Sequence, residues 1–152
     1  ATGGTPEVVV AADSSIRHSR ATWPWYLPDG KHFLYLARRD AANASIMYAA
    51  PGSAPRALFD VGSGMAFTNP DLLVYVQEGT LFARHFNWRE GRLVGGPVPV
   101  ADTVRYFLST GGAAFGTSAG GTLAYLSKDN VAQLTWMDRS GRELGTLGAP
   151  GD

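Results

Sequence analysis

The stretch LPDGKHFLYLA (residues 27–37) decides the fold. It begins with Pro, Asp and Gly, which favour a tight turn, and it continues as a run of apolar residues that favours a strand. Two degraded copies follow along the chain, TNPDLLVYVQ (68–77) and TSAGGTLAYLS (117–127). Aligning Tyr35 with Tyr75 and Tyr125 gives spacings of 40 and 50 residues. The chain therefore contains three copies of one structural unit.

Each copy is flanked by further strand-like runs with turn signals between them. The preceding runs are TWPWY (22–26), GMAFT (64–68) and AAFGT (113–117). The following runs are SIMYAA (45–50) and RALFDV (56–61), TLFARHF (80–86) and PVPVAD (97–102), and AQLTWMD (132–138) and ELGTL (143–147). Four short strands in a repeat of about 40–50 residues are typical of a β-propeller blade. The sequence predicts an all-β fold, a propeller segment of three four-stranded antiparallel blades.

The expected organisation is a single partial propeller domain over residues 1–152. It comprises a leading outer strand and loop over 1–21, followed by blades over 22–62, 63–102 and 103–152. The leading strand is PEVVVAA (6–12), which matches the fourth strand of a preceding blade. We expect almost no helix, because the repeat assigns the Ala-rich run RRDAANASIMYAA (38–50) to a loop and a strand.

Composition excludes several classes of protein. With 45% hydrophobic and 17% charged residues the chain is not disordered. It has no cysteine, which excludes disulfides and thiolate metal sites, and its formal net charge of zero argues against nucleic-acid binding. No apolar run reaches the roughly 20 residues of a membrane span, so we expect no direct membrane insertion. ATGGTPEVVV at the start lacks the pattern of a signal peptide and an initiator Met, which suggests a processed or excised chain.

Residues 116–120, GTSAG, match the G-x-S-x-G pattern of serine hydrolases. That nucleophile elbow needs a strand, a sharp turn and then a helix, whereas a strand is expected after Ser118. The last histidine, His85, also precedes Ser118, so an α/β-hydrolase triad in its usual order is missing. We predict that Ser118 lies in a turn and that the chain is not an enzyme. The alternative is a hydrolase domain that uses Ser118 or the loop histidine His18.

Three longer motifs carry a resemblance to a known family. They are WPWYLPDGKHFLYLAR (23–38), EGTLFARHFNWREGRLVGGPVPVAD (78–102) and GTLAYLSKDNVAQLTWMDRSGRELGTLGAPGD (121–152). In this order they resemble successive blades of a TolB-like, WD-repeat-like β-propeller, the one that follows the kinase domain in some bacterial serine/threonine protein kinases. The resemblance covers essentially the whole chain.

This resemblance implies a non-catalytic interaction module, a sensor or scaffold portion on the extracytoplasmic, periplasmic side of receptor-type kinases. The chain departs from the family because it has neither the glycine-rich phosphate loop nor the His-Arg-Asp catalytic loop of a kinase. Three blades are also fewer than the usual 4–8. A purely structural, self-assembling propeller fragment is a further alternative.

Propeller topology places the loops between second and third strands on the same face as the loops between blades. This arrangement gathers a basic rim of Arg17, His18, Arg20, Arg38, Arg39, Arg105 and Tyr106. Such a rim is suited to an anionic or peptide ligand held by charge-assisted hydrogen bonds. The alternative is a solvated loop rim neutralised by Asp13, Asp40 and Asp102.

Trp23 and Trp25 lie two residues apart on the first inner strand, so alternation places both on one face. They line a ligand channel or, alternatively, pack between blades. His18, His32 and His85 lack metal-ligand spacing, and no calcium-loop motif occurs. We expect neither a metal nor a cofactor.

The partial ring leads to a prediction about assembly. The first and third blades are expected to expose apolar faces that carry Phe33, Tyr35, Leu123 and Tyr125. Exposed faces of this kind mark interfaces, and two copies of three blades close a six-bladed ring. We therefore expect a homodimer, with a protein or peptide as a further partner. The leading strand (6–12) must then pair as a fifth strand, replace 143–147 in the partner's last blade, or stay frayed.

Overall fold

The computed structural model describes residues 3–5, 7–10, 20–40, 43–68, 70–118, 120–127, 132–140 and 142–151. Within these ranges the chain is all β and contains no helix, as the sequence predicts. The strands form several small antiparallel sheets, and none of the sheets is closed.

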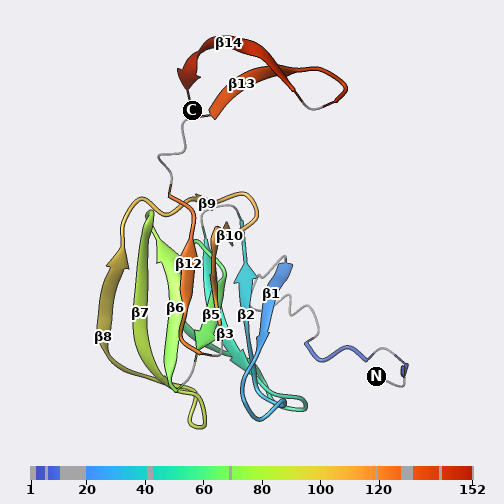
Figure 1. The fold of residues 1–152 in the computed structure, drawn as a ribbon. Helices are drawn as coiled ribbons and strands as arrows, with labels where there is room; N and C mark the ends of the chain where they lie inside the picture. The colour runs from blue at the N-terminus through green and yellow to red at the C-terminus, as the bar shows by residue number, and fades with distance from the viewer. Residues whose placement is uncertain are drawn as a thin grey trace.

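Two four-stranded sheets follow one another along the chain (Figure 1). The first sheet has the order β1 (Arg20–Tyr26), β2 (Phe33–Arg38), β3 (Ala44–Ala49) and β4 (Arg56–Asp60). The second sheet has the order β5 (Met65–Thr68), β6 (Leu72–Gln77), β7 (Thr80–Asn87) and β8 (Arg92–Ala101). Each is a simple meander in which every strand pairs with the next one along the chain.

The apolar runs of β2 and β6 are buried on both faces of their sheets, which explains why they are continuous rather than alternating. In β2, Leu34 and Leu36 face the second sheet and join the main core. Phe33 and Tyr35 face the opposite way and form a separate cluster. Both sides of β2 are therefore covered by other parts of the chain.

The main core lies between the two sheets. The first sheet contributes Leu34, Leu36 and Ile46, and the second contributes Phe67 and Phe86 among others. Phe86 is fully buried, and its ring meets the rings of Tyr48 and Phe67 edge-on at centroid distances of 6.0 and 6.3 Å. Since burying apolar side chains is the main favourable term in folding, this interface holds the two sheets together.

A second link joins the sheets at the turn over residues 88–91, between β7 and β8. The Tyr48 hydroxyl of β3 donates to the Trp88 carbonyl at 3.0 Å. The Arg56 guanidinium of β4 donates to the carbonyls of Glu90 at 3.2 Å and Gly91 at 2.6 Å. Side chains of the first sheet thereby satisfy backbone groups of a turn in the second, and we call this contact the turn clamp.

The LPDGKH turn between β1 and β2 is organised by Asp29. Its Oδ1 accepts hydrogen bonds from the backbone N–H groups of Lys31 and His32, both at 3.0 Å. Its Oδ2 lies 2.5 Å from Nδ1 of the His32 ring. Gly30 follows with a φ of 66°, a value that glycine adopts without steric cost. The hydrogen bond from the His32 side chain, helped by the Lys31 amide, lowers the pKa of Asp29 from 3.8 to about 2.

This shift predicts an acid-sensitive turn. Because the folded pKa lies below the ordinary value, ionised Asp29 stabilises the fold above pH 3.8, and this stabilisation is lost as the pH falls towards 2. Asp29→Asn keeps an acceptor oxygen but removes the titration. We expect the urea midpoint of the wild type to fall more steeply between these pH values than that of Asp29→Asn, measured by tryptophan fluorescence. Parallel curves for the two proteins would contradict the prediction.

The third unit differs from the expected four-stranded blade. It consists of three two-stranded sheets, β9 (Tyr106–Phe107) with β10 (Gly112–Ala113), β11 (Phe115–Thr117) with β12 (Leu123–Tyr125), and β13 (Ala132–Met137) with β14 (Glu143–Gly151). Figure 1 shows the β13–β14 hairpin standing apart from the two large sheets. Just beyond β12, the Leu126 carbonyl accepts from the Arg105 N–H at 2.9 Å, so the connecting segment before β9 takes part in the pairing.

The inner strands of the three units are neighbours. β5 contacts both β1 and β11. The Gly64 N–H just before β5 donates to the Gly111 carbonyl at 2.6 Å, and the Thr68 hydroxyl at its end donates to the Ser118 carbonyl at 3.1 Å. The second sheet is therefore bonded to the third unit at both ends of its inner strand.

Two expectations about the first sheet are wrong. Residues 7–10, the described part of the expected leading strand, form no strand, and Val10 instead packs on the Phe33 and Tyr35 cluster. The outer face of this sheet is consequently not bare, since Tyr35 is only 4% exposed. In the third unit Leu123 is half-buried against the second sheet, whereas Tyr125 is exposed as expected.

Strand β8 begins earlier than predicted, at Arg92 rather than at 97. The sequence GRLVGGPVPV reads as a turn because it is rich in Gly and Pro. Here Gly95 has a φ of 66° and lies where the register with β7 shifts, so it belongs to a bulge. As β8 is the edge strand, Pro97 and Pro99 are tolerated in it.

Candidate functional site

A cleft of about 400 Å³ opens at one end of the inner strands. Its walls come from the start of β1, the end of β2 and the turn after β9, and it is lined by Arg20, Thr22, Trp23, Arg38, Ser109 and Thr110. We call it the arginine cleft. Three of the residues predicted from the sequence for ligand binding or the basic rim thus meet in one place, Arg20, Trp23 and Arg38.

Arg38 is buried and forms the floor of the arginine cleft. Its Nη2 donates to the carbonyl of Leu108, in the turn between β9 and β10, and lies 3.4 Å from the carbonyl oxygen of Asp40. Arg38 therefore positions the turn over residues 108–110 against the first sheet, besides placing a positive charge beneath the cleft.

Trp23 forms one wall. The backbone of β1 bulges between Thr22 and Trp25, and Trp23 has a φ of 55°, which is uncommon for a residue other than glycine. Its indole Nε1–H donates to the Thr110 carbonyl at 3.0 Å. Simple alternation along β1 does not hold here because of the bulge, so Trp23 contacts the turn after β9 while Trp25 packs on the main core.

Arg20 supplies the accessible charge. It is exposed at the start of β1, and among the described residues it forms no ion pair. On the turn after β2, the Asp40 carboxylate accepts hydrogen bonds from the backbone and side-chain amides of Asn43 at 2.9 Å and 2.7 Å. An exposed and a buried guanidinium that line one cleft favour an anionic group there.

The other predicted rim residues lie elsewhere. Arg39 is exposed on the β2–β3 turn, where its N–H donates to the Asn43 carbonyl. Arg105 is half-buried, and its backbone bonds to Leu126 and Ala114. Tyr106 packs against the apolar cluster of β6 and β7. Arg17 and His18 lie outside the described residues.

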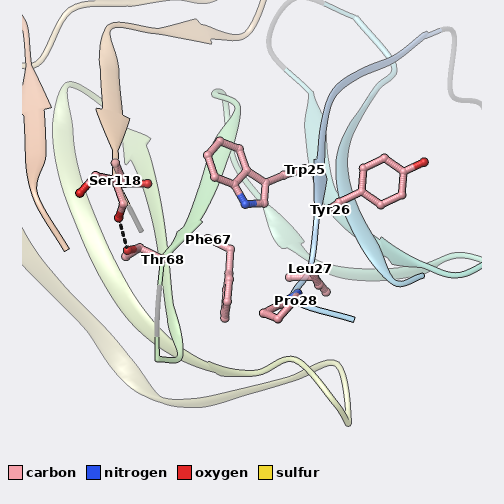
Figure 2. A pocket seen from close by; sticks show the side chains of 8 residues that line it. Trp25, Tyr26, Leu27, Pro28, Phe67, Thr68 and Ser118 are labelled. Carbon is pink, nitrogen blue, oxygen red and sulfur yellow. Dashed lines mark hydrogen bonds between the residues drawn. The ribbon is translucent and has the colours of Figure 1, made fainter. Parts of the chain in front are cut away.

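A second cavity of about 230 Å³ lies at the opposite ends of the inner strands, and of its lining residues the sequence predicted only Trp25 for ligand binding. Figure 2 shows Trp25 and Tyr26 leaving β1 in different directions, with Trp25 turned towards Phe67 of the neighbouring strand. The remaining lining residues are Leu27, Pro28, Thr68, Thr117 and Ser118. The end of each inner strand contributes to it, and the aligned repeat is the signal that could have revealed it.

Ser118 occupies the turn between β11 and β12, as predicted. Its Oγ accepts the Thr122 N–H at 3.1 Å, and its N–H donates to the Thr122 carbonyl at 2.9 Å. None of the residues lining the adjacent cavity is a histidine or a carboxylate, so no described neighbour there is suited to take the Ser118 proton.

Within the described part of the chain, no group of three or more His, Cys, Asp or Glu side chains is placed to hold a metal ion. His32 and His85 each pair with a single aspartate, Asp29 and Asp71, at different sheets. None of the described residues forms a helix with the length and apolar character needed to cross a membrane.

Comparisons of the chain with protein-family models, with curated proteins and with solved structures find no match.

Proposed function

We propose that this chain is a non-catalytic interaction module, a portion of a β-propeller sensor or scaffold that binds an acidic peptide segment of a partner protein in the arginine cleft. The observation that carries the proposal is the exposed guanidinium of Arg20, which forms no ion pair with another described residue and lines the same cleft as the buried Arg38 and Trp23. An extracytoplasmic, periplasmic location belongs to the proposal and rests on the resemblance to receptor-type kinases.

The architecture supports the propeller part of the proposal. Two successive meanders have the same strand order, and their inner strands are neighbours. Apolar side chains fill the space between them, as they do between neighbouring blades. In the third unit, strand β11 pairs with β12 and contacts β5 of the second sheet.

Charge supports the ligand class. Arg20 and Arg38 bring two guanidinium groups to one cleft whose other lining residues are neutral. Arginine binds carboxylates in a planar, two-pronged geometry, and the Trp23 ring adds an apolar surface for a side chain or peptide plane. An acidic peptide matches both features.

The test is calorimetric titration with an acetylated, amidated tetraglutamate peptide. We expect Arg20→Gln to weaken binding by about 5- to 10-fold, since an exposed ion pair contributes about 1 kcal/mol. Arg139→Gln is the matched control, because Arg139 is an exposed arginine on the β13–β14 turn, away from the cleft. Added salt should weaken wild-type binding. Equal affinities for the two variants, or no binding by the wild type, would refute the proposal for this cleft.

The absence of catalysis is tested separately. We expect the wild type and Ser118→Ala to hydrolyse 4-nitrophenyl acetate at the same background rate, because Ser118 lies in a hairpin turn without a base beside it. A hydrolysis rate that disappears in Ser118→Ala would favour the hydrolase alternative instead.

A further inference from the structure

The third unit leaves one strand edge open. Among the described residues, strand β12 pairs with β11 on one side only, in a two-stranded sheet. Ser118 N–H donates to Thr122 and Leu126 N–H donates to Ala114, so every second residue of this ladder is bonded across it. Leu123 and Tyr125 fall between those residues and direct their backbone N–H and C=O groups to the other side. An open edge of this kind is a template for pairing with another strand.

The structure also shows which strand belongs at that edge. In both large sheets the strand that follows the second one pairs with it, β3 with β2 and β7 with β6. In the third unit the corresponding strand is β13, yet within the part of the chain that the structure describes it pairs with β14 and not with β12. The β13–β14 hairpin lies away from the β12 of its own chain (Figure 1).

The β13–β14 hairpin exposes large apolar side chains to solvent. Trp136 is 62% exposed and Leu144 is 61% exposed. A two-stranded hairpin is marginally stable in water and needs a further strand or a packing surface. The open edge of β12 can accept a strand, and the hairpin requires a further strand to pair with. Each copy of the chain has both features.

We propose that the open edge of β12 is the docking site for strand β13 of a second copy of this chain. The exchange is reciprocal, since each copy gives its hairpin and receives the other's, and the two-fold axis closes the assembly as a dimer. Each third unit then becomes a four-stranded sheet in the order β11–β12–β13–β14. Such an exchange does not need a bare face on the first sheet, which the six-bladed ring predicted from the sequence requires.

A substitution that blocks only the open edge tests the proposal. Tyr125→Pro removes an N–H that points away from β11, so the β11–β12 pairing keeps its hydrogen bonds. Tyr125→Val is the matched control, because it also removes the ring but retains the N–H and favours a strand. Light scattering should give about twice the monomer mass of 16.2 kDa for the wild type and Tyr125→Val, and the monomer mass for Tyr125→Pro.

Cross-linking distinguishes exchange from closure within one chain. As the chain has no cysteine, the double variant Tyr125→Cys/Thr135→Cys carries the only two thiols, one on β12 and one on β13. A flexible bismaleimide should yield a covalent dimer on a denaturing gel. An internally cross-linked monomer, a wild type that stays monomeric, or a dimer that survives Tyr125→Pro would each overturn the proposal.

Discussion

Replacing Phe86 with alanine is expected to lower the free energy of unfolding by about 3–5 kcal/mol. Phe86 is fully buried between the two large sheets, where its ring packs edge-on against Tyr48 and Phe67. Removing the ring loses its transfer free energy and leaves a cavity that the paired strands on both sides cannot close. Since a domain is stable by only about 5–15 kcal/mol, the urea midpoint should fall sharply.

Phe107→Ala is the matched control for this change. Phe107 is 52% exposed on β9, so the same substitution should cost about 1 kcal/mol or less. Urea unfolding followed by tryptophan fluorescence measures both variants. Equal losses for Phe86→Ala and Phe107→Ala would show that the interface between the sheets is not the main core.

Gly91→Ala is expected to cost about 2–5 kcal/mol, through two separate effects. Gly91 ends the turn of the turn clamp with a φ of 63°, and a residue with a side chain loses about 1–2 kcal/mol in that region. Its added methyl carbon would also lie 2.7 Å from two ring carbons of Tyr48 and 2.7 Å from an Arg56 nitrogen. Overpacking of this kind costs about 1–3 kcal/mol more.

Gly79→Ala separates the two effects. Gly79 has a φ of 85° in the β6–β7 turn, but nothing lies within 4 Å of the carbon that alanine would add. It should show the backbone cost alone, so Gly91→Ala should be the more destabilising by about 1–3 kcal/mol in chemical unfolding. If the two variants unfold at the same urea concentration, Tyr48 and Arg56 can move aside at no cost in stability, and the turn clamp does not restrict position 91.

The all-β class and the antiparallel sheets are the part of the fold that the sequence predicted correctly. Turn residues followed by apolar runs predicted the strands of the first two meanders, although Tyr35, which was expected on an exposed face, is buried. The failures have physical reasons. Val8 and Val9 read as a strand because Val favours strands, but the segment has no partner strand among the described residues. In β8 the Gly and Pro residues suggested a turn, although an edge strand with a bulge accepts both.

The candidate site was predictable only in part. The expected loop topology predicted that Arg38 lies near the loops of the third unit. The sequence could not show that its guanidinium would be buried and would donate to the Leu108 carbonyl. Alternation could not foresee the bulge that turns Trp23 aside, because a bulge depends on backbone contacts with distant residues. The cavity beside Trp25 lies where the ends of β1, β5 and β11 meet, and aligning the repeats indicates that these ends are equivalent but not that a cavity lies between them.

The placement of Trp23 has a consequence for how this sequence can vary. A side-chain carbon added at Gly64 would lie 3.0 Å from the Trp23 side chain, and one added at Gly112 would lie 3.4 Å from its ring. One added at Gly111, where φ is 70°, would lie 2.6 Å from both Leu36 and Arg38. A larger residue at position 64 is thus acceptable only alongside a smaller one at 23. In related proteins, positions 23 and 64 should therefore vary together, so that a residue smaller than Trp at 23 accompanies any loss of glycine at 64.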